Sequence, residues 1–452
     1  MTGRGRRGRS HHPWLLPSQK VSHISQLPGS DLFRKGVGAL LNARVRLVLY
    51  QVVLSLALSC RSGAGTGDNG LGFLEKRVKG DSADFIAWNQ LASRYLECAR
   101  ETGDDAWIAK ASHAADASLE AIPEKPNTGG LAAQARVDLA RHCFPEALVK
   151  ARRLDAIRPG DTEPLPIMAD ALIEMGDLDE AAKVLAEWEK HAGQAVNLEP
   201  RLARLALAHG RLEEARMHLS AAAEAARKLA SPSPLSVAWC EVQLGELAFR
   251  MGDWQSAENS YLAALKAKAD WWSAREHLAE LRAAQGRTDE AFKIYDEVIA
   301  LAPRPELMQA VGDLHLFLND RPAAKKWHDR ALAAYRTASQ NGSVAYYHHL
   351  AGFFCDSEPD ASEAVSAARK DLELRHSGAA YDALAWALYK SGDLTGASAA
   401  ATKALESGVK DSHILYHAGL IRMSAGDLPG GQAALREAAA VNPQFQAFHV
   451  HR

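Results

Sequence analysis

The chain has 452 residues, with 53 Lys and Arg, 55 Asp and Glu and a formal net charge of −2. This balance excludes the strongly basic composition that proteins use to displace counterions from nucleic acids. A chain of this length would ordinarily form two or three globular domains, so internal repetition is the first property to test.

The first 46 residues differ in composition from everything that follows. They carry nine Lys or Arg residues and a single acidic residue, Asp31, so they contribute +8 and residues 47–452 carry about −10. Such an acidic segment favours neutral or basic binding partners.

Residues 47–59, LVLYQVVLSLALS, form a continuous apolar run of thirteen residues. This is shorter than the roughly 20 residues of a membrane-spanning helix. A basic segment, a short apolar run and then small residues are the order typical of a secretory signal peptide. The run ends in Leu56-Ala57-Leu58-Ser59-Cys60, which resembles a permissive bacterial lipobox in which Cys60 would be acylated.

We therefore expect residues 1–60 to be a basic leader plus signal peptide of an exported protein, either periplasmic or a membrane-anchored lipoprotein. Two alternatives stay open. An ordinary signal-peptide site would be cut at the same bond, and the unusually long basic leader is also compatible with a cytoplasmic chain.

Residues 61–82 are rich in glycine and predict a flexible tether, because glycine raises the entropy cost of ordering a segment. Gly65, Gly67 and Gly70 satisfy the G-x-G-x-x-G pattern of dinucleotide-binding loops. That pattern is meaningful only within a strand-loop-helix unit, and the chain downstream is helical in pattern throughout. We therefore expect no nucleotide site here.

Residues 272–303, WSAREHLAELRAAQGRTDEAFKIYDEVIALAP, have the apolar spacing of two short antiparallel helices. Ala279 and Ala291 are small enough to let the two helices approach, and larger residues fill the space between them. These larger residues are Leu278, Tyr295 and Val298.

The same segment carries signals for where its helices end. Gly286 can end the first helix in the left-handed conformation, Thr288 can cap the second and Pro303 stops it. The pattern recurs about ten times, mostly at intervals of 33 or 34 residues. The counterparts of Ala291 are Ala147, Ala181, Ala215, Ala257, Ala324, Ala364, Ala397 and Gly431, and those of Gly286 are Gly176, Gly210, Gly252, Gly392 and Gly426. Longer intervals after Ala215 and Ala324 predict lengthened second helices.

This pattern resembles the tetratricopeptide repeat, a helix-turn-helix unit of 34 residues. The resemblance covers residues 83–443. It implies an all-α fold, a right-handed α-solenoid of about ten tandem units in which each unit packs only against its neighbours.

Residues 444–452 remain as a short tail, too short for a capping hairpin. Phe445 and Phe448 are expected to fold back over the apolar face of the last unit, formed by Leu428, Leu435 and Val441. Self-association through the last repeat is also expected.

The resemblance implies that the first helix of each unit lines a concave groove that binds a peptide or protein. The residues expected to face the groove are Trp239, Phe249, Glu276, His277, Glu280, Asp313, His348, His349, Asp382, Trp386, Tyr389, His413, Tyr416 and His417. The function expected is a non-catalytic scaffold for protein–protein interaction that uses no cofactor.

A metal-binding or metal-delivery protein is the alternative, because His413 and His417 share one helix face and His348 and His349 lie two units earlier. A solvated helix face, with imidazoles stacked on Tyr416 and Tyr389, explains the same residues without a metal.

The sequence contains no H-E-x-x-H, no G-x-S-x-G and no phosphate loop, which argues against an enzyme. Among the cysteines of the array, only Cys98 and Cys143 lie in adjacent units. A disulfide between them is the alternative to the buried thiols that we expect.

Overall fold

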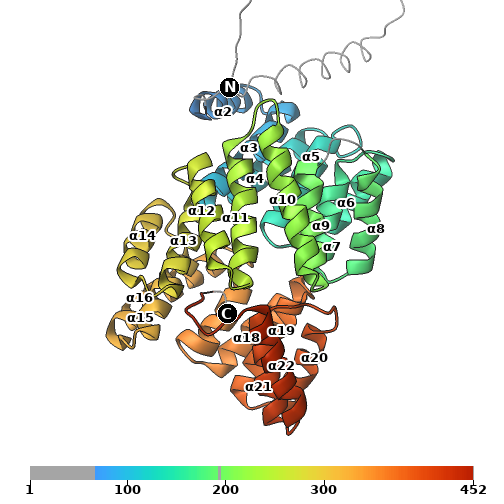
Figure 1. The fold of residues 1–452 in the computed structure, drawn as a ribbon. Helices are drawn as coiled ribbons and strands as arrows, with labels where there is room; N and C mark the ends of the chain where they lie inside the picture. Colours follow the sequence, from blue (N-terminus) through green and yellow to red (C-terminus); the bar gives the residue numbers. More distant parts are fainter. Residues whose placement is uncertain (1–66, 192–194, 451–452) are drawn as a thin grey trace, which may run out of the picture. The chain divides into compact units, whose positions relative to one another are not determined.

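The structure is a computed structural model that describes residues 67–191 and 195–450. Within these ranges every regular element is a helix and no strand is present. This confirms the predicted all-α fold class. Figure 1 shows the helices following one another in chain order, joined by short connections.

Successive helices pack in pairs as helical hairpins, as short connections between helices require. The N-terminal pairs are α3 (Phe85–Thr102) with α4 (Ala106–Ala121), α5 (Thr128–Ala140) with α6 (Phe144–Ile157), α7 (Pro164–Glu174) with α8 (Leu178–Glu189) and α9 (Ala195–Ala208) with α10 (Leu212–Lys228). The central pairs are α11 (Pro234–Arg250) with α12 (Trp254–Ala267), α13 (Trp272–Ala284) with α14 (Thr288–Leu301) and α15 (Pro305–Phe317) with α16 (Arg321–Gln340). The last pairs are α17 (Tyr347–Gly352) with α18 (Ala361–Leu374), α19 (Gly378–Ser391) with α20 (Leu394–Ala404) and α21 (Ser412–Ser424) with α22 (Leu428–Val441).

The small residues predicted at the hairpin interiors are buried in every case. The eight alanines at the Ala291 position are at most 2% exposed. A Cβ added to Gly431, their counterpart in the last hairpin, would lie 2.3 Å from Met423 Cγ and 2.7 Å from Gly419 O. These positions admit only a small side chain because the two helices of a hairpin touch there. The predicted repeat phase is therefore confirmed.

The turn between the two helices of most hairpins contains a residue with positive φ. Gly286 has φ 75°, and the predicted glycines at the other turns have values between 69° and 94°. In two hairpins His142 (φ 62°) and Asn319 (φ 64°) take this conformation without glycine. Asparagine and histidine both occur at positive φ more often than most other non-glycine residues.

The second helices begin mostly at an aspartate. Asp177, Asp253, Asp320, Asp393 and Asp427 each accept a hydrogen bond from the backbone N–H three residues ahead. Such caps satisfy amides that have no partner inside the helix. The expectation for Thr288 was wrong, because Thr288 is the first residue of α14 and Arg287 stands at the cap without a side-chain bond.

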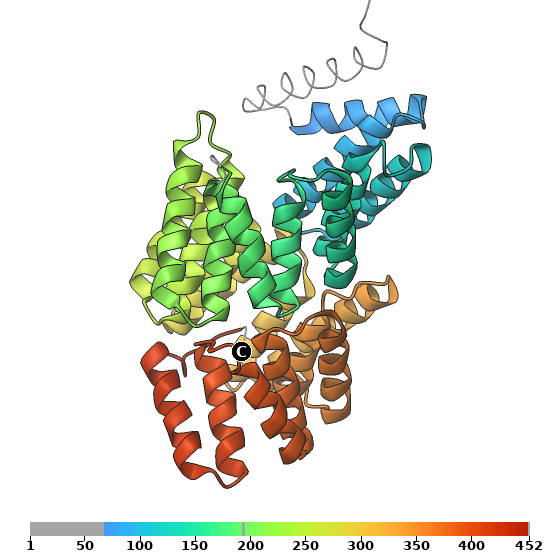
Figure 2. The same ribbon diagram turned by 90° about the vertical axis from the view of Figure 1, so that its right-hand side faces the viewer.

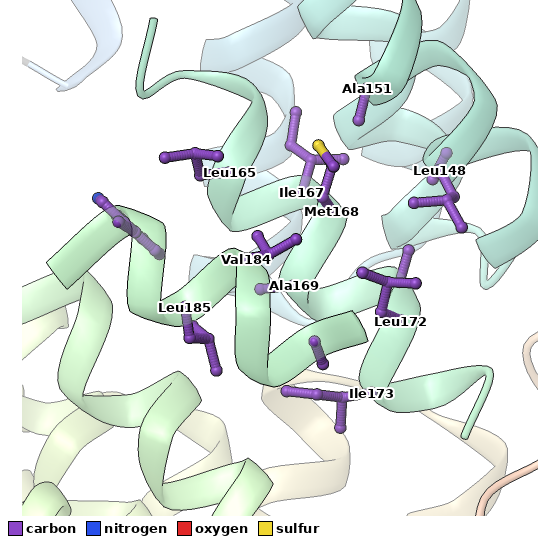
Figure 3. Packing of buried hydrophobic residues seen from close by; sticks show 14 of the residues in the cluster. Leu148, Ala151, Leu165, Ile167, Met168, Ala169, Leu172, Ile173, Val184 and Leu185 are labelled. Atoms are coloured by element: carbon purple, nitrogen blue, oxygen red, sulfur yellow. The ribbon is translucent and has the colours of Figure 1, made fainter. Parts of the chain in front are cut away.

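Apolar side chains from neighbouring hairpins form a series of separate buried clusters along the array. Figure 3 shows one part of it, where Leu165, Met168 and Leu172 of α7 meet Val184 and Leu185 of α8. Leu148 and Ala151 of α6 belong to the same cluster.

The two longer intervals correspond to lengthened second helices, as predicted. α10 has 17 residues and α16 has 20. After α16 the first helix of the next pair is short and continues as a turn of π-helix, η1 (Phe353–Ser357). A π-turn inserts a residue into the helix and re-aims the side chains that follow.

The region expected to be a glycine-rich tether is helical over most of its length. Helix α2 covers Gly67–Gly80, and its Leu71, Leu74 and Val78 pack against the first hairpin. Apolar residues three, four and seven positions apart lie on one helix face, so their burial offsets the entropy cost of ordering glycine. The tether prediction is wrong for residues 67–80.

Segments far apart in sequence also touch, contrary to the expectation that each unit meets only its neighbours. The indole N–H of Trp272 donates to Arg100 O, Arg304 Nη1 donates to Gly103 O, and the backbone N–H of His376 donates to Glu174 O. These residue pairs are about 170 to 200 positions apart. Figure 2 shows α9 to α12 lying next to α19 to α22.

Two of the turn glycines lie at these long-range contacts. A Cβ added to Gly210 would be 2.2 Å from Gly408 O, and one added to Gly176 would be 2.5 Å from His376 O. Glycine is therefore required there for close backbone approach as well as for positive φ. None of the helices within the described residues is long and apolar enough to cross a membrane.

Candidate functional site

The groove residues predicted from the sequence come from the first helices α11, α13, α15, α17, α19 and α21. Eleven of the fourteen lie on α13, α17, α19 and α21, and six of these line one cavity between the central and last hairpins. We describe this surface, formed by the first helices from α11 to α21, as the groove.

Carboxylates and one imidazole of α11 and α13 form a largely buried polar cluster in the groove. His277 Nε2 lies 2.8 Å from Glu246 Oε1, and His277 Nδ1 lies 3.7 Å from Glu280 Oε2. Burial alone would lower the pKa of His277, but the carboxylates of Glu246 and Glu280 raise it well above its ordinary value. The imidazole is therefore held in its charged form between two glutamates.

Glu276 lies beside this cluster on α13 and has the opposite character. Burial raises the pKa of Glu276 to about 7, and His277 lowers it only in part. A buried carboxyl with such a pKa changes its charge near neutral pH.

The chain's own residues 443–450, the tail segment, lie against the groove at this point. His449 Nδ1 lies 2.5 Å from Glu280 Oε1, and the backbone N–H of Val450 donates to the same oxygen at 2.7 Å. The His449 ring meets Phe249 edge-on at 5.2 Å and His413 at 4.6 Å between ring centroids. Glu280 is only 2% exposed, so its charge depends on these partners.

Phe448 is the apolar anchor of the tail segment. Its side chain is 2% exposed and joins a cluster formed by α13, α14 and α15, which includes Ala279, Val311 and Leu314. Its ring meets Phe317 edge-on at a centroid distance of 5.6 Å. Burying such a ring contributes about 1.5 to 3 kcal/mol.

This placement corrects the expectation that the tail covers the last hairpin. Phe448 packs on α13 to α15 instead, and Leu428 of the last hairpin is 54% exposed. Only Phe445 stays near the last hairpin, at 5.6 Å from the Tyr416 ring. The reason is that the end of α22 lies beside the turn after α11, where a Cβ on Gly252 would be 2.6 Å from Asn442 Oδ1.

On α19 and α21, an imidazole is fixed between a carboxylate and an indole. His417 Nδ1 lies 2.9 Å from Asp382 Oδ2, and its ring stacks on Trp386 at 4.0 Å with an interplanar angle of 12°. The indole N–H of Trp386 donates to Asp356 Oδ2 at 2.9 Å. The stacking partner is thus Trp386, not Tyr389, which itself stacks on Trp386 at 5.2 Å.

The remaining predicted residues are held by neighbouring helices. Asp313 accepts a hydrogen bond from Ser357 Oγ at 2.6 Å and lies 2.9 Å from His328 Nε2. His348 Nδ1 lies 3.3 Å from the buried Asp371 Oδ2. Trp239 on α11 is the most accessible of the predicted aromatic residues, at 36% exposure.

A cavity of 280 Å³ lies between α15, α17, α19, α21 and the tail segment. Six of the predicted groove residues line it, from three successive first helices, together with two residues of the tail segment. The predicted residues are His348, His349, Asp382, Trp386, His413 and His417, and the tail residues are His449 and Val450. The sequence thus predicted that these six lie on one surface.

Sequence reasoning missed a second cavity of 680 Å³ between α7 to α11 and α19 to α22. Arg375 lies at its edge, 3.6 Å from Glu174 Oε2 and 3.0 Å from His142 Nδ1. Burial and the charge of Arg375 lower the pKa of His142 to about 4. No local pattern could have indicated this cavity, because its walls are about 200 residues apart.

Among the described residues, no group of three or more His, Cys, Asp or Glu side chains is placed to hold a metal ion. His413 and His417, although four residues apart on one helix, are directed to different partners, His449 and Asp382. The described cysteines, Cys98, Cys143, Cys240 and Cys355, are free thiols, so the disulfide alternative for Cys98 and Cys143 is wrong. Cys60 lies outside the described residues.

Comparison with family models identifies the repeat in parts of the chain. One model of the tetratricopeptide repeat matches residues 194–270, and a second model of this repeat matches residues 242–304 and 383–444. No curated protein matches the chain in a sequence search.

Solved structures with similar architecture include several helical-repeat proteins. A tetratricopeptide repeat protein from Parabacteroides merdae is 14% identical, with 54% of this chain and 93% of that chain covered and a TM-score of 0.38. Yeast Tom70 is 14% identical, with 83% and 88% covered and a TM-score of 0.35. The human IFIT1 dimer with PPP-AAAA is 12% identical, with 83% and 86% covered and a TM-score of 0.43. The matches to the tetratricopeptide repeat models thus cover residues 194–304 and 383–444, within a longer all-helical array.

Proposed function

We propose that this protein is a non-catalytic scaffold that binds a neutral or basic segment of another protein in the groove. The supporting observation is the 280 Å³ cavity, where side chains from α17, α19 and α21 converge around Trp386. Concave sites that combine aromatic surface with a few placed polar groups are typical of binding sites. The carboxylates of Glu306 and Asp382 at this cavity favour a neutral or cationic ligand over an anionic one.

Trp386 offers the sharpest test of this proposal. Its ring stacks on His417 and is partly exposed, as expected for an aromatic residue that dominates binding energy. The matched control is Leu262 on α12, an exposed apolar residue outside the cavity. Proteins crosslinked to the full chain should be recovered with the Leu262→Ala variant and lost with Trp386→Ala, each measured well below the melting temperature of that variant. Equal recovery with both variants would refute the groove as the binding site.

We also propose that the protein is exported and anchored to a membrane through a lipid on Cys60. The support is the basic segment, the apolar run 47–59 and the residues Ala57-Leu58-Ser59-Cys60. Cys60→Ala should abolish incorporation of radiolabelled palmitate and move the protein from the membrane to the soluble fraction. The exposed Leu428 supports self-association through the last repeat. A Leu428→Lys variant should self-associate less strongly, which sedimentation would measure.

A further inference from the structure

The tail segment behaves in the structure as a peptide ligand would. It follows α22 without regular structure and places one aromatic side chain, Phe448, in an apolar recess of α13 to α15. The next residue, His449, lies against the buried carboxylate of Glu280, and the backbone N–H of Val450 donates to the same oxygen. An aromatic anchor gives a short peptide much of its binding affinity, and a neighbouring charged contact fixes the orientation in which the peptide binds.

Glu280 is the residue that makes this contact specific. It is 2% exposed and lies near His277 on one side and the tail segment on the other. A carboxylate buried to this degree is stable only with donors close to it, so an acidic ligand side chain in place of His449 would be repelled. A cationic side chain or an imidazole is accepted.

We propose that the recess of α13 to α15 and Glu280 form a recognition site for a protein segment in which an aromatic residue precedes a histidine or another basic residue. The tail segment occupies this site in the free protein and competes with such a partner. This inference rests on the proposed function of the groove and adds the chemistry of the partner and a means of regulation.

The short connection makes the competition effective. α22 ends at Val441, seven residues before Phe448, so the tail segment is presented to the site at an effective concentration on the order of mM. A partner segment of micromolar affinity therefore binds only weakly until the tail segment is displaced or removed. The recess and the 280 Å³ cavity are adjacent, since His449 and Val450 line the cavity.

A labelled peptide with the sequence of residues 443–452 provides the probe. Fluorescence anisotropy should show that it binds a chain ending at Asn442 at least roughly tenfold more tightly than the full chain. Glu280→Gln in the shortened chain should weaken binding roughly tenfold, whereas Glu373→Gln, the same change at an exposed site on α18, should not. Equal affinity for the shortened and full chains would overturn the competition.

Variants of the peptide test the chemistry of the ligand. Phe448→Ala should abolish binding, and Gln446→Ala, at an exposed position of the tail segment, should leave it unchanged. His449→Lys should bind and His449→Glu should not, because Glu280 repels a second carboxylate. Binding of the His449→Glu peptide at full affinity would refute the role of Glu280.

A full-length Phe448→Ala variant tests the same competition if the shortened chain does not fold. This variant retains the tail segment but lacks the aromatic anchor, so it should bind the unmodified peptide more tightly than the wild-type chain does. If no peptide binds while Trp386-dependent capture of partners persists, this inference fails and the proposed function stands. If both are lost, both fail.

Discussion

Two carboxylates of α7, in the N-terminal hairpins, face arginines, whereas two carboxylates of α11 and α13, in the central hairpins, face histidines. Asp170 of α7 lies 2.6 Å from Arg201 and 2.7 Å from Arg204, and Glu174 lies 2.7 Å from Arg204. On α11 and α13, Glu246 lies 2.8 Å from His277 and Glu280 lies 2.5 Å from His449.

The two arrangements have similar geometry but respond differently to pH. A guanidinium stays charged at every pH a folded protein survives, whereas an imidazole can lose its proton near neutrality. The comparison indicates that the pairs of Asp170 and Glu174 are constant in charge. The pairs of Glu246 and Glu280, where the tail segment binds, have a strength that depends on pH.

The largest effect is expected from removing the central imidazole. His277→Leu leaves Glu246 and Glu280 without their shared cation and should lower the free energy of unfolding by roughly 3 to 5 kcal/mol at pH 6. The raised pKa means that His277 stabilises the fold fully below about pH 6.5 and that this contribution is lost as pH rises through the raised value. Urea denaturation at pH 6 and pH 9 should show a smaller cost at pH 9. The same cost at both pH values would contradict the histidine pairing.

Glu276 should give the next largest effect and tests the sign of the pH dependence. Its pKa of about 7 lies above the value of about 4.5 in the unfolded chain, so its contribution to stability is full below pH 4.5 and lost as pH rises through 7. Glu276→Gln removes that loss. Relative to wild type, the variant should gain on the order of 3 kcal/mol between pH 4.5 and pH 8. A constant difference across this range would show that Glu276 ionises normally.

The hairpin interiors provide a matched pair of substitutions that should lower stability by the same amount in both regions. Ala169 in α7 and Ala279 in α13 occupy the same repeat position and are fully buried. Leucine at either position should overpack the hairpin and lower the free energy of unfolding by roughly 1 to 3 kcal/mol. Ala300→Leu, at an exposed site on α14, is the control and should change the midpoint of urea denaturation little. An unaltered midpoint for Ala169→Leu or Ala279→Leu would mean that the repeat phase is wrong.

The smallest effect is expected from the N-terminal pairs. Arg204→Leu should cost about 1 to 2 kcal/mol, because the side chain is partly exposed and Arg201 still neutralises Asp170. This cost should be the same at pH 6 and pH 9. If it changes with pH as strongly as the cost of His277→Leu, the distinction between the two regions fails.

The sequence predicted the parts of the structure that depend on local spacing. Ala291 and its counterparts, the turn glycines and the two lengthened helices all follow from a period of about 34 residues, which fixes how each hairpin packs. The groove face was also predictable, because the repeat phase decides which side of a first helix points away from its partner. His348, Asp382 and His417 meet at one cavity for this reason.

The sequence could not show which distant segments come into contact. The tail segment reaches Glu280, 169 residues away, only because small rotations between many successive hairpins bring the end of α22 beside α11. No local pattern records the sum of those rotations. The same limitation explains why His277 and Glu276 were expected on an accessible surface and are buried.

The sequence also did not predict helix α2. Its glycines favoured a flexible tether, and the three apolar residues that stabilise the helix pack against partners outside it.

The contacts between hairpins about 200 residues apart also determine how the array should come apart. Linear repeat proteins unfold piecemeal, since each unit is coupled only to the next one and the ends fray independently. Here Arg304 bonds to Gly103 O, Arg375 lies against His142 and His209 Nδ1 lies 3.3 Å from Ser407 O, so opening one end also breaks contacts in the middle. Unfolding should therefore approach a single cooperative transition. Refolding should be slow for a helical protein, because these non-local contacts close large loops and raise the contact order.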